Sequence, residues 1–170
     1  HKILRHMDNS AGIEHFPERQ MDMCRLGLGL YGVNPRDNSI INNVSSLKTT
    51  ILQLREVTPP DTIGYSRRGT IGKPSVIAAI PIGYADGLDR HLGNRHCYCL
   101  VNGQKAEYVG NICMDVAMID VTGIDCHEGD SVEIFGDNLP VTVLSDILET
   151  IPYEVLTGIS NRVKRIYFQD

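Results

Sequence analysis

The chain has 170 residues, of which 42% are hydrophobic, and 16 lysines and arginines against 21 aspartates and glutamates give a net charge of −5. This composition is typical of a globular domain and excludes a disordered chain, and the acidic balance excludes the basic surface of a nucleic-acid-binding or membrane-surface protein. No apolar run approaches the ~18 residues of a membrane-spanning helix and no signal peptide opens the chain, so the sequence predicts a cytoplasmic protein. The absence of an initiator methionine before His1 indicates a fragment of a longer protein.

The first part of the chain combines polar loops with one long apolar segment. Residues 23–33 are apolar and spaced by glycines, and Asn34-Pro35 follows them. A continuous apolar run of this length predicts a strand buried on both faces, as in a parallel sheet or barrel. The polar stretch 38–43 has no periodicity, and we place a domain boundary there, with residues 1–39 on one side and 40–170 on the other.

Beyond this boundary the pattern is that of strands. Asn102-Gly103 between two short runs indicates a tight hairpin, and apolar residues at helical spacing over 142–153 predict a helix. The remaining segments, rich in β-branched residues or alternating in polarity, are predicted as strands: 44–57, 75–82, 112–121, 131–135 and 163–168. The sequence therefore predicts a mainly β domain over 40–170, and its frequent turns favour a closed or Greek-key barrel.

The cysteines and histidines do not form a metal-binding pattern. The five cysteines include no C-x-x-C pair, and the six histidines lack the spacing of metal ligands. A structural zinc site needs four converging nitrogen or sulfur ligands. We therefore expect no metal, and reduced thiols as in a cytoplasmic protein.

Two clusters in the first part of the chain and near its middle contain residues suited to chemistry. Glycine beside small polar groups, as in Asn9-Ser10 with the segment 24–28, forms either a phosphate cradle or a plain turn. Arg25 lies inside an apolar run, where its guanidinium must find an acceptor. Tyr65 is followed by two arginines, Arg67 and Arg68, whose positive charge would favour the phenolate, although a tyrosine is more often a half-buried packing residue.

Two further clusters follow, Ile80–Gly87 and Gly110–Asp115. Cys113 lies in the second of them and could be a nucleophile. No histidine is near it in the sequence, so a buried thiol is the better interpretation.

Together and in this order, these clusters resemble the C-terminal part of the alanine racemases, isomerases that use pyridoxal 5'-phosphate to interconvert L- and D-alanine. The resemblance rests on seven segments: Asn9–Ala11, Met23–Gly27, Leu30–Gly32, Gly64–Ser66, Ile80–Gly87, Gly110–Asp115 and Gly129–Asp130. It implies that residues 1–39 are the last segment of a (β/α)8 barrel that binds the cofactor, and that residues 40–170 are a C-terminal Greek-key-like β-barrel domain. It also implies a bacterial homodimer that makes D-alanine for the peptidoglycan of the cell wall.

The resemblance implies a role in the reaction for four residues of the second part. Tyr65 would be the catalytic base that acts on L-alanine, placed across the dimer interface in the partner's cofactor site. Met114 would contact the substrate through its backbone and Asp115 would lie beside it. Tyr84 would line the access channel.

The resemblance also implies a set of cofactor-binding residues. Arg25 would face the pyridine nitrogen, and His6 would support Arg25 from behind. The groups around the phosphate would be Asn9, Ser10, Gly27, Leu28 and Asn161. Most of the family has a tyrosine where Asn161 stands, and that tyrosine reaches both the phosphate and the catalytic tyrosine, so Asn161 leaves the orientation of Tyr65 open.

Two departures from the family pattern shape the interpretation. No segment resembles the motif of the lysine that holds the cofactor as a Schiff base and serves as the other base, so the chain alone is expected to be inactive. Asn161 and the ending 163–168 are similar to racemases fused to a UDP-N-acetylmuramoyl-tripeptide–D-alanyl-D-alanine ligase. The alternatives are a racemase for serine or lysine, a related decarboxylase, and a non-catalytic dimerisation or regulatory β module.

Overall fold

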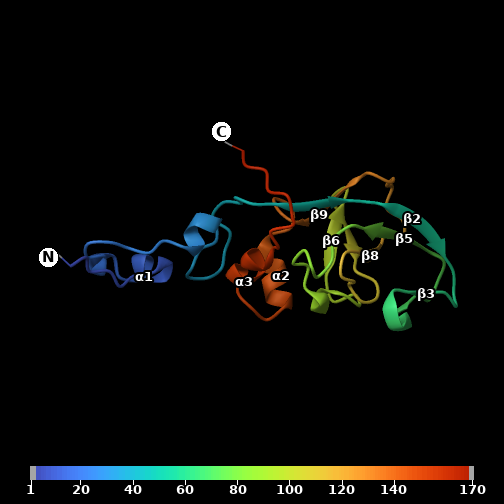
Figure 1. Ribbon diagram of the computed structural model, residues 1–170, viewed down its shortest axis with the longest axis horizontal. Helices are drawn as coiled ribbons and strands as arrows, with labels where there is room; N and C mark the ends of the chain where they lie inside the picture. Colours follow the sequence, from blue (N-terminus) through green and yellow to red (C-terminus); the bar gives the residue numbers. More distant parts are fainter. Residues whose placement is uncertain (1–2, 169–170) are drawn as a thin grey trace. The chain divides into compact units, whose positions relative to one another are not determined.

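The computed structural model describes residues 3–168 and divides the chain into two units, His1–Ser46 and Leu47–Asp170 (Figure 1). The first unit contains three short helical elements: α1 (Ser10–His15), η1 (Pro17–Arg19) and η2 (Leu28–Tyr31). Asn9 caps α1, because its side-chain oxygen accepts a hydrogen bond from the Gly12 N–H at 3.0 Å.

The strand predicted over residues 23–33 is wrong. Within this segment only Leu28–Tyr31 form a regular element, the 3-10 helix η2, which is followed by Gly32 in the left-handed conformation (φ +75°). An added Cβ at Gly32 would lie 1.6 Å from the carbonyl oxygen of Asn42, so the chain turns tightly here and only glycine fits. Leu28 and Val33 of this segment are buried, whereas Leu26 is 52% and Leu30 64% exposed.

The second unit is mainly β, as the sequence predicts. Its strands form a four-stranded sheet in the order β1-β9-β6-β7, a three-stranded sheet β2-β5-β8 and the hairpin β3-β4, and all the ladders are antiparallel. The strands are β1 (Leu47–Thr50), β2 (Gln53–Val57), β3 (Thr62–Ile63), β4 (Gly69–Thr70), β5 (Ser75–Ile80), β6 (Tyr98–Val101), β7 (Gln104–Glu107), β8 (Ala117–Asp120) and β9 (Ser131–Phe135). The helical elements are η3 (Tyr65–Arg67), η4 (Arg90–Leu92), α2 (Val141–Ile147) and α3 (Pro152–Gly158).

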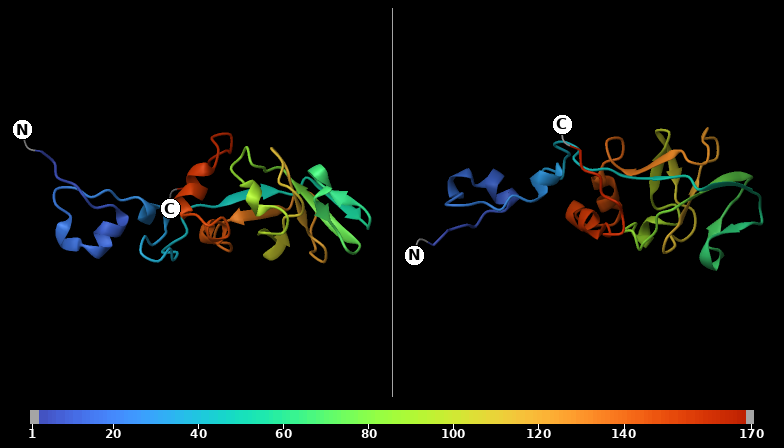
Figure 2. Two further views of the ribbon diagram at one scale, coloured as in Figure 1. Left: turned by 90° about the horizontal axis from the view of Figure 1, so that it is seen from below. Right: turned by 45° about the horizontal axis from the view of Figure 1, so that its top comes forward.

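One predicted strand, 44–57, connects the two larger sheets. Its chain switches partners between β1 and β2: the Ile51 N–H donates to Asp130 O at 3.0 Å, and the next N–H, of Leu52, donates to Ala79 O at 2.8 Å. A single bridge between Tyr108 and Ile119 joins the other ends of the sheets. The ladders thus follow one another around a common core as in a Greek-key barrel, but they remain separate open sheets (Figures 1 and 2).

The other predicted elements are confirmed in different degrees. Strands β5 and β9 occupy the predicted segments, and the β6–β7 hairpin turns at Asn102 and Gly103, both with positive φ. Only the second half of 112–121 is a strand, since 112–116 form a loop. The helix predicted over 142–153 is interrupted after α2, where Glu149 has a φ of +54°, and helix α3 begins at Pro152.

The strand predicted over 163–168 is wrong. The Arg165 guanidinium donates to the carbonyl of Ile159 at 2.9 Å, and the Val163 N–H donates to Ser160 O at 3.1 Å. These bonds join the segment to the residues just before it, so it does not pair with a strand. Its Tyr167 side chain is 87% exposed.

Alternating residues of the strands fill the core of the second unit. Ile80, Val101, Ile119, Val132 and Ile134 are at most 1% exposed. Burial of such side chains is the main driving force for folding of this unit. Within residues 3–168, the helices are all too short or too polar to cross a membrane.

Candidate functional site

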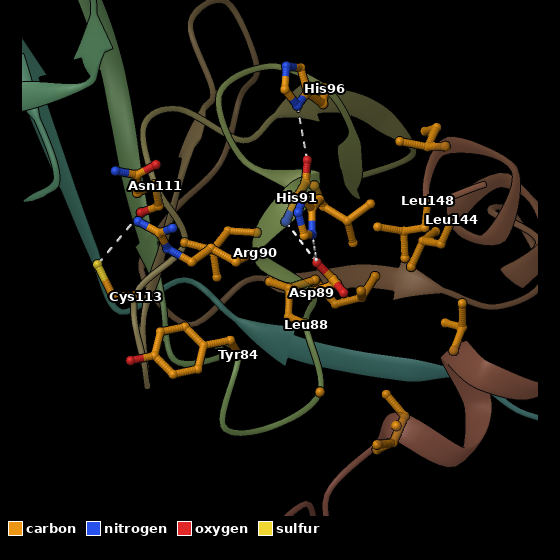
Figure 3. A pocket seen from close by; sticks show the side chains of 18 of the residues that line it. Tyr84, Leu88, Asp89, Arg90, His91, His96, Asn111, Cys113, Leu144 and Leu148 are labelled. Atoms are coloured by element: carbon orange, nitrogen blue, oxygen red, sulfur yellow. Dashed lines mark hydrogen bonds and ion pairs between the residues drawn. The ribbon is translucent and has the colours of Figure 1, made fainter. Parts of the chain in front are cut away.

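A large groove in the second unit brings together the residues predicted to act on the substrate. Tyr65, Tyr84, Met114 and Asp115 all line it, and its volume is about 1950 Å³. In Figure 3, Tyr84 and Cys113 lie on one side of the groove, and Leu144 of helix α2 and Leu148 just after that helix lie on the other. Small-molecule sites usually have volumes of ~300–1000 Å³. The groove is therefore large enough to receive another surface as well as a substrate.

Tyr65 is held on a strained turn that projects its side chain away from the core. It follows Gly64, whose φ is +72°, and precedes Ser66, whose φ is +58°. The side-chain amide of Asn111 donates to Tyr65 O at 3.4 Å, and Asn94 in turn donates to Asn111 Oδ1 at 3.0 Å. The Tyr65 side chain is 73% exposed. A phenol placed in this way is available to a group outside this unit.

The neighbouring arginines do not both turn toward the phenol. Arg67 Nε donates to Thr62 Oγ1 at 3.3 Å, on the adjoining strand β3. This bond fixes the hairpin next to Tyr65, so Arg67 contributes to the geometry of the turn.

Tyr84 and Met114 are brought together by backbone contacts between two loops. The Tyr84 N–H donates to Cys113 O and the Ala85 N–H donates to Met114 O, each at 3.0 Å. An added Cβ at Gly83 would lie 2.3 Å and 2.4 Å from the carbonyl oxygens of Cys113 and Met114. Only glycine allows this approach, and it leaves the Met114 side chain exposed beside Tyr84.

Asp86 and Arg162 form a charged link behind these loops. Arg162 Nε lies 3.0 Å from Asp86 Oδ1, and Arg162 Nη2 forms an ion pair with Asp115 Oδ1. The hydrogen bond with Asp115 raises the pKa of Arg162. Asp86 lies within the segment Ile80–Gly87 and Arg162 directly follows Asn161, but the sequence pattern indicates a role for neither. Asn161, predicted to bind phosphate, is exposed and directly precedes Arg162.

Apart from Asn161, the predicted cofactor-binding residues lie in the first unit. Ser10 is buried, and its hydroxyl accepts a hydrogen bond from the Gly27 N–H at 2.8 Å, just before buried Leu28. The Arg25 guanidinium finds the acceptor that the sequence requires in Met7 O, at 2.8 Å. Within residues 3–168, no hydrogen bond connects His6 to Arg25.

The chemistry of the first unit fits pyridoxal 5'-phosphate. Phosphates in proteins are usually surrounded by backbone N–H groups, hydroxyls and side-chain amides. This unit offers all three kinds of group, including the Asn9 side chain. A guanidinium donates hydrogen bonds and cannot accept them. It therefore suits the pyridine nitrogen of the cofactor, which must act as the acceptor if it is to stay unprotonated. Ser10 and Gly27 are in contact within this unit, through the hydrogen bond from the Gly27 N–H to the Ser10 hydroxyl.

Comparison with known proteins relates both units to one family. Residues 44–167 match the family model "Alanine racemase, C-terminal domain". The chain is 39% identical to an alanine racemase of Desulfosudis oleivorans, with 96% of this chain and 44% of that protein covered. It is 42% identical to alanine racemase 2 of Caldanaerobacter subterraneus subsp. tengcongensis, with the same coverage of both chains.

A solved structure shows the same similarity. The alanine racemase of Bartonella henselae, solved with covalently bound pyridoxal phosphate, matches with a TM-score of 0.90 and 35% identity. The match covers 99% of this chain and 48% of that chain. The chain therefore spans somewhat less than half the length of these relatives.

Proposed function

Because the chain belongs to the alanine racemase family, we propose that it forms part of a pyridoxal-phosphate-dependent racemase that interconverts L- and D-alanine. One observation carries the proposal: the exposed phenol of Tyr65 lines the same groove as Tyr84, Met114 and Asp115. Packing alone does not require an exposed tyrosine on a turn that positive φ angles strain.

Racemisation removes the α-proton from one face of the amino acid and returns a proton to the other, so it needs a base on each face. Tyr65 is the base that takes the α-proton of L-alanine, or returns it, through its phenolic oxygen. The other base is a lysine outside this chain, which also binds the cofactor covalently, so the 170-residue chain alone is inactive. Met114 contacts the substrate through its backbone, with Asp115 beside it and Tyr84 at the entrance.

The residues of the first unit bind the cofactor, which when bound supplies the electron sink that makes the α-proton acidic. Ser10, Asn9 and the backbone around Gly27 hold its phosphate, with Asn161 as a further donor. Arg25 donates to the ring nitrogen and disfavours its protonation. His6 supports Arg25.

In this proposal residues 1–39 complete a (β/α)8 barrel, and Tyr65 reaches the cofactor site of the partner subunit in a homodimer. Its exposure within this chain supports that placement. The product, D-alanine, serves peptidoglycan synthesis in the cytoplasm. Fusion of the parent chain to a peptide ligase stays a prediction from the sequence around Asn161.

The proposal is tested by incubating the intact parent protein with pyridoxal phosphate and either L- or D-alanine, with the 170-residue chain as control. Chiral chromatography should detect the opposite enantiomer from the parent and none from the control. Serine and lysine are assayed in parallel. Turnover of one of these in place of alanine would move the substrate assignment, and no turnover of any of them would favour a non-catalytic module.

A further inference from the structure

Arg162 connects three segments that are far apart in the sequence. Its guanidinium contacts Asp86, in the loop that carries Tyr84. It also contacts Asp115, which follows Met114 and precedes Arg162 by 47 residues. Its own segment packs on the first loop, because the Ser160 N–H donates to Asp86 O at 3.0 Å.

The close approach of the same segments leaves no room for a side chain at Gly87. An added Cβ there would lie 2.5 Å from Gly158 O. The segment that presents Arg162 is therefore fixed by backbone packing, and the guanidinium is placed between the two carboxylates.

The charges of this cluster depend on Arg162. The side chain of Asp86 is 12% exposed, and its second oxygen accepts a hydrogen bond from the Gly83 N–H at 2.9 Å. Among the described residues, the ion pair with Arg162 is the contact that neutralises Asp115. Without the guanidinium, two carboxylates would face each other with no cation between them, and one of them lines the groove.

An amino-acid substrate brings a carboxylate of its own, and a like charge beside it weakens binding. We propose that Arg162 is a positioning residue that fixes Asp115 in a charge-balanced position at the groove, so that the carboxylate of an amino acid can bind next to Met114. This inference rests on the proposed function, since it assumes that the groove receives the amino acid.

The test uses the intact parent protein with bound cofactor and four variants. Arg162→Gln removes the charge, Arg162→Lys keeps it, and the double variant Arg162→Gln/Asp115→Asn removes the unpaired carboxylate as well. Arg95→Gln is the matched control, because Arg95 also bridges two carboxylates, Glu107 and Asp120, away from the groove. The measurements are KM and kcat for L-alanine, the thermal midpoint, and the inhibition constant of propionate, an unreactive carboxylate of similar size.

For Arg162→Gln we expect KM and the propionate inhibition constant to rise by about tenfold with kcat reduced less than about threefold. The double variant should lower the propionate inhibition constant by at least about threefold relative to Arg162→Gln, since the unbalanced charge is gone. Arg162→Lys should lie between wild type and Arg162→Gln. Arg95→Gln should lower the thermal midpoint as much as Arg162→Gln but change both constants less than about twofold.

An Arg162→Gln protein whose constants match those of Arg95→Gln would overturn the inference, and so would a double variant that recovers nothing. If Arg162→Gln does not fold, Arg162→Lys and the double variant decide in the same way. If the wild-type parent racemises alanine but Arg162→Gln leaves both constants unchanged, this inference is refuted and the proposed function stands. A wild-type parent without any racemase activity refutes the proposed function, and the inference with it.

Discussion

Two apolar segments of the same chain differ in how far their side chains are buried. Ile77 and Ile80 in strand β5 are at most 5% exposed, whereas Leu26 and Leu30 in the first unit are more than half exposed. Strand β5 is paired on both sides, by β2 and by β8. The first unit has no sheet among its described residues, and its longest helix has six residues. Apolarity therefore indicates that a segment is covered in the intact protein, but not by which part of it.

The difference also separates two ways of building a site. The β unit places Tyr65, Tyr84 and Met114 on loops held by a core of its own. The first unit fixes Ser10 and Arg25 mainly through hydrogen bonds to nearby backbone. If residues 1–39 complete a (β/α)8 barrel, as we propose, the rest of that barrel should cover the exposed apolar side chains of the first unit in the intact parent.

A large effect is expected at Gly83, where the β unit is packed most closely. Gly83→Ala in the 170-residue chain should lower the free energy of unfolding by about 2–4 kcal/mol, because the added methyl group meets two backbone carbonyl oxygens that have no room to move. Gly72→Ala is the control, since no atom lies within 4 Å of the Cβ it would add. Urea unfolding followed by circular dichroism measures both, and equal effects would show that the loops around Gly83 are loosely packed.

A second comparison uses one leucine from each unit. Leu92→Ala, at 1% exposure, should destabilise both the 170-residue chain and the intact parent by about 2–5 kcal/mol. Leu30→Ala should lower the free energy of unfolding of the 170-residue chain by less than about 0.5 kcal/mol. In the parent it should lower this free energy by about 2 kcal/mol, if the barrel covers Leu30 there. Urea unfolding of both proteins gives these values. No effect of Leu30→Ala in the parent would contradict the assignment of the first unit to the barrel.

The smallest effect concerns pH. Burial raises the pKa of the Cys99 thiol to about 12, whereas a cysteine in an unfolded chain titrates near ~8.5. The stability that this difference provides is complete below pH 8.5 and is lost as the pH rises toward 12. Between pH 8.5 and 9.5 the loss should be about 1 kcal/mol.

Urea unfolding under reducing conditions at these two pH values checks this prediction. In Cys99→Ala, the loss in the free energy of unfolding between pH 8.5 and 9.5 should be smaller by about 1 kcal/mol than in the wild type. Cys24→Ala should keep all of it, because that thiol lies in the first unit, outside the β core. An unchanged pH dependence in Cys99→Ala would mean that another group is responsible.

The sequence predicts the β core well because its signals are local. Asn102-Gly103 fixes a hairpin turn. Val132 and Ile134 of β9 point inward as their alternation predicts, although Glu133 and Phe135 on the other face are buried as well. The segments 23–33 and 163–168 have the apolar pattern of strands but form none, since periodicity does not reveal whether a neighbouring strand is present.

For the site, the resemblance to a family identified Tyr65, Tyr84 and Met114, and the structure brings these three to one groove. The roles of Asp86 and Arg162 could not be predicted from spacing. They depend on a contact between segments that only the folded chain brings together.

The central claim is that Tyr65 moves the α-proton of L-alanine. The most direct measurement is the rate at which the intact parent exchanges this proton in D₂O, followed by NMR, for wild type, Tyr65→Phe and the control Tyr167→Phe. Tyr65→Phe should reduce the exchange by at least about 100-fold with the melting temperature unchanged, because the side chain is exposed, and Tyr167→Phe should match wild type. Exchange from L-alanine at the wild-type rate in Tyr65→Phe would contradict the account.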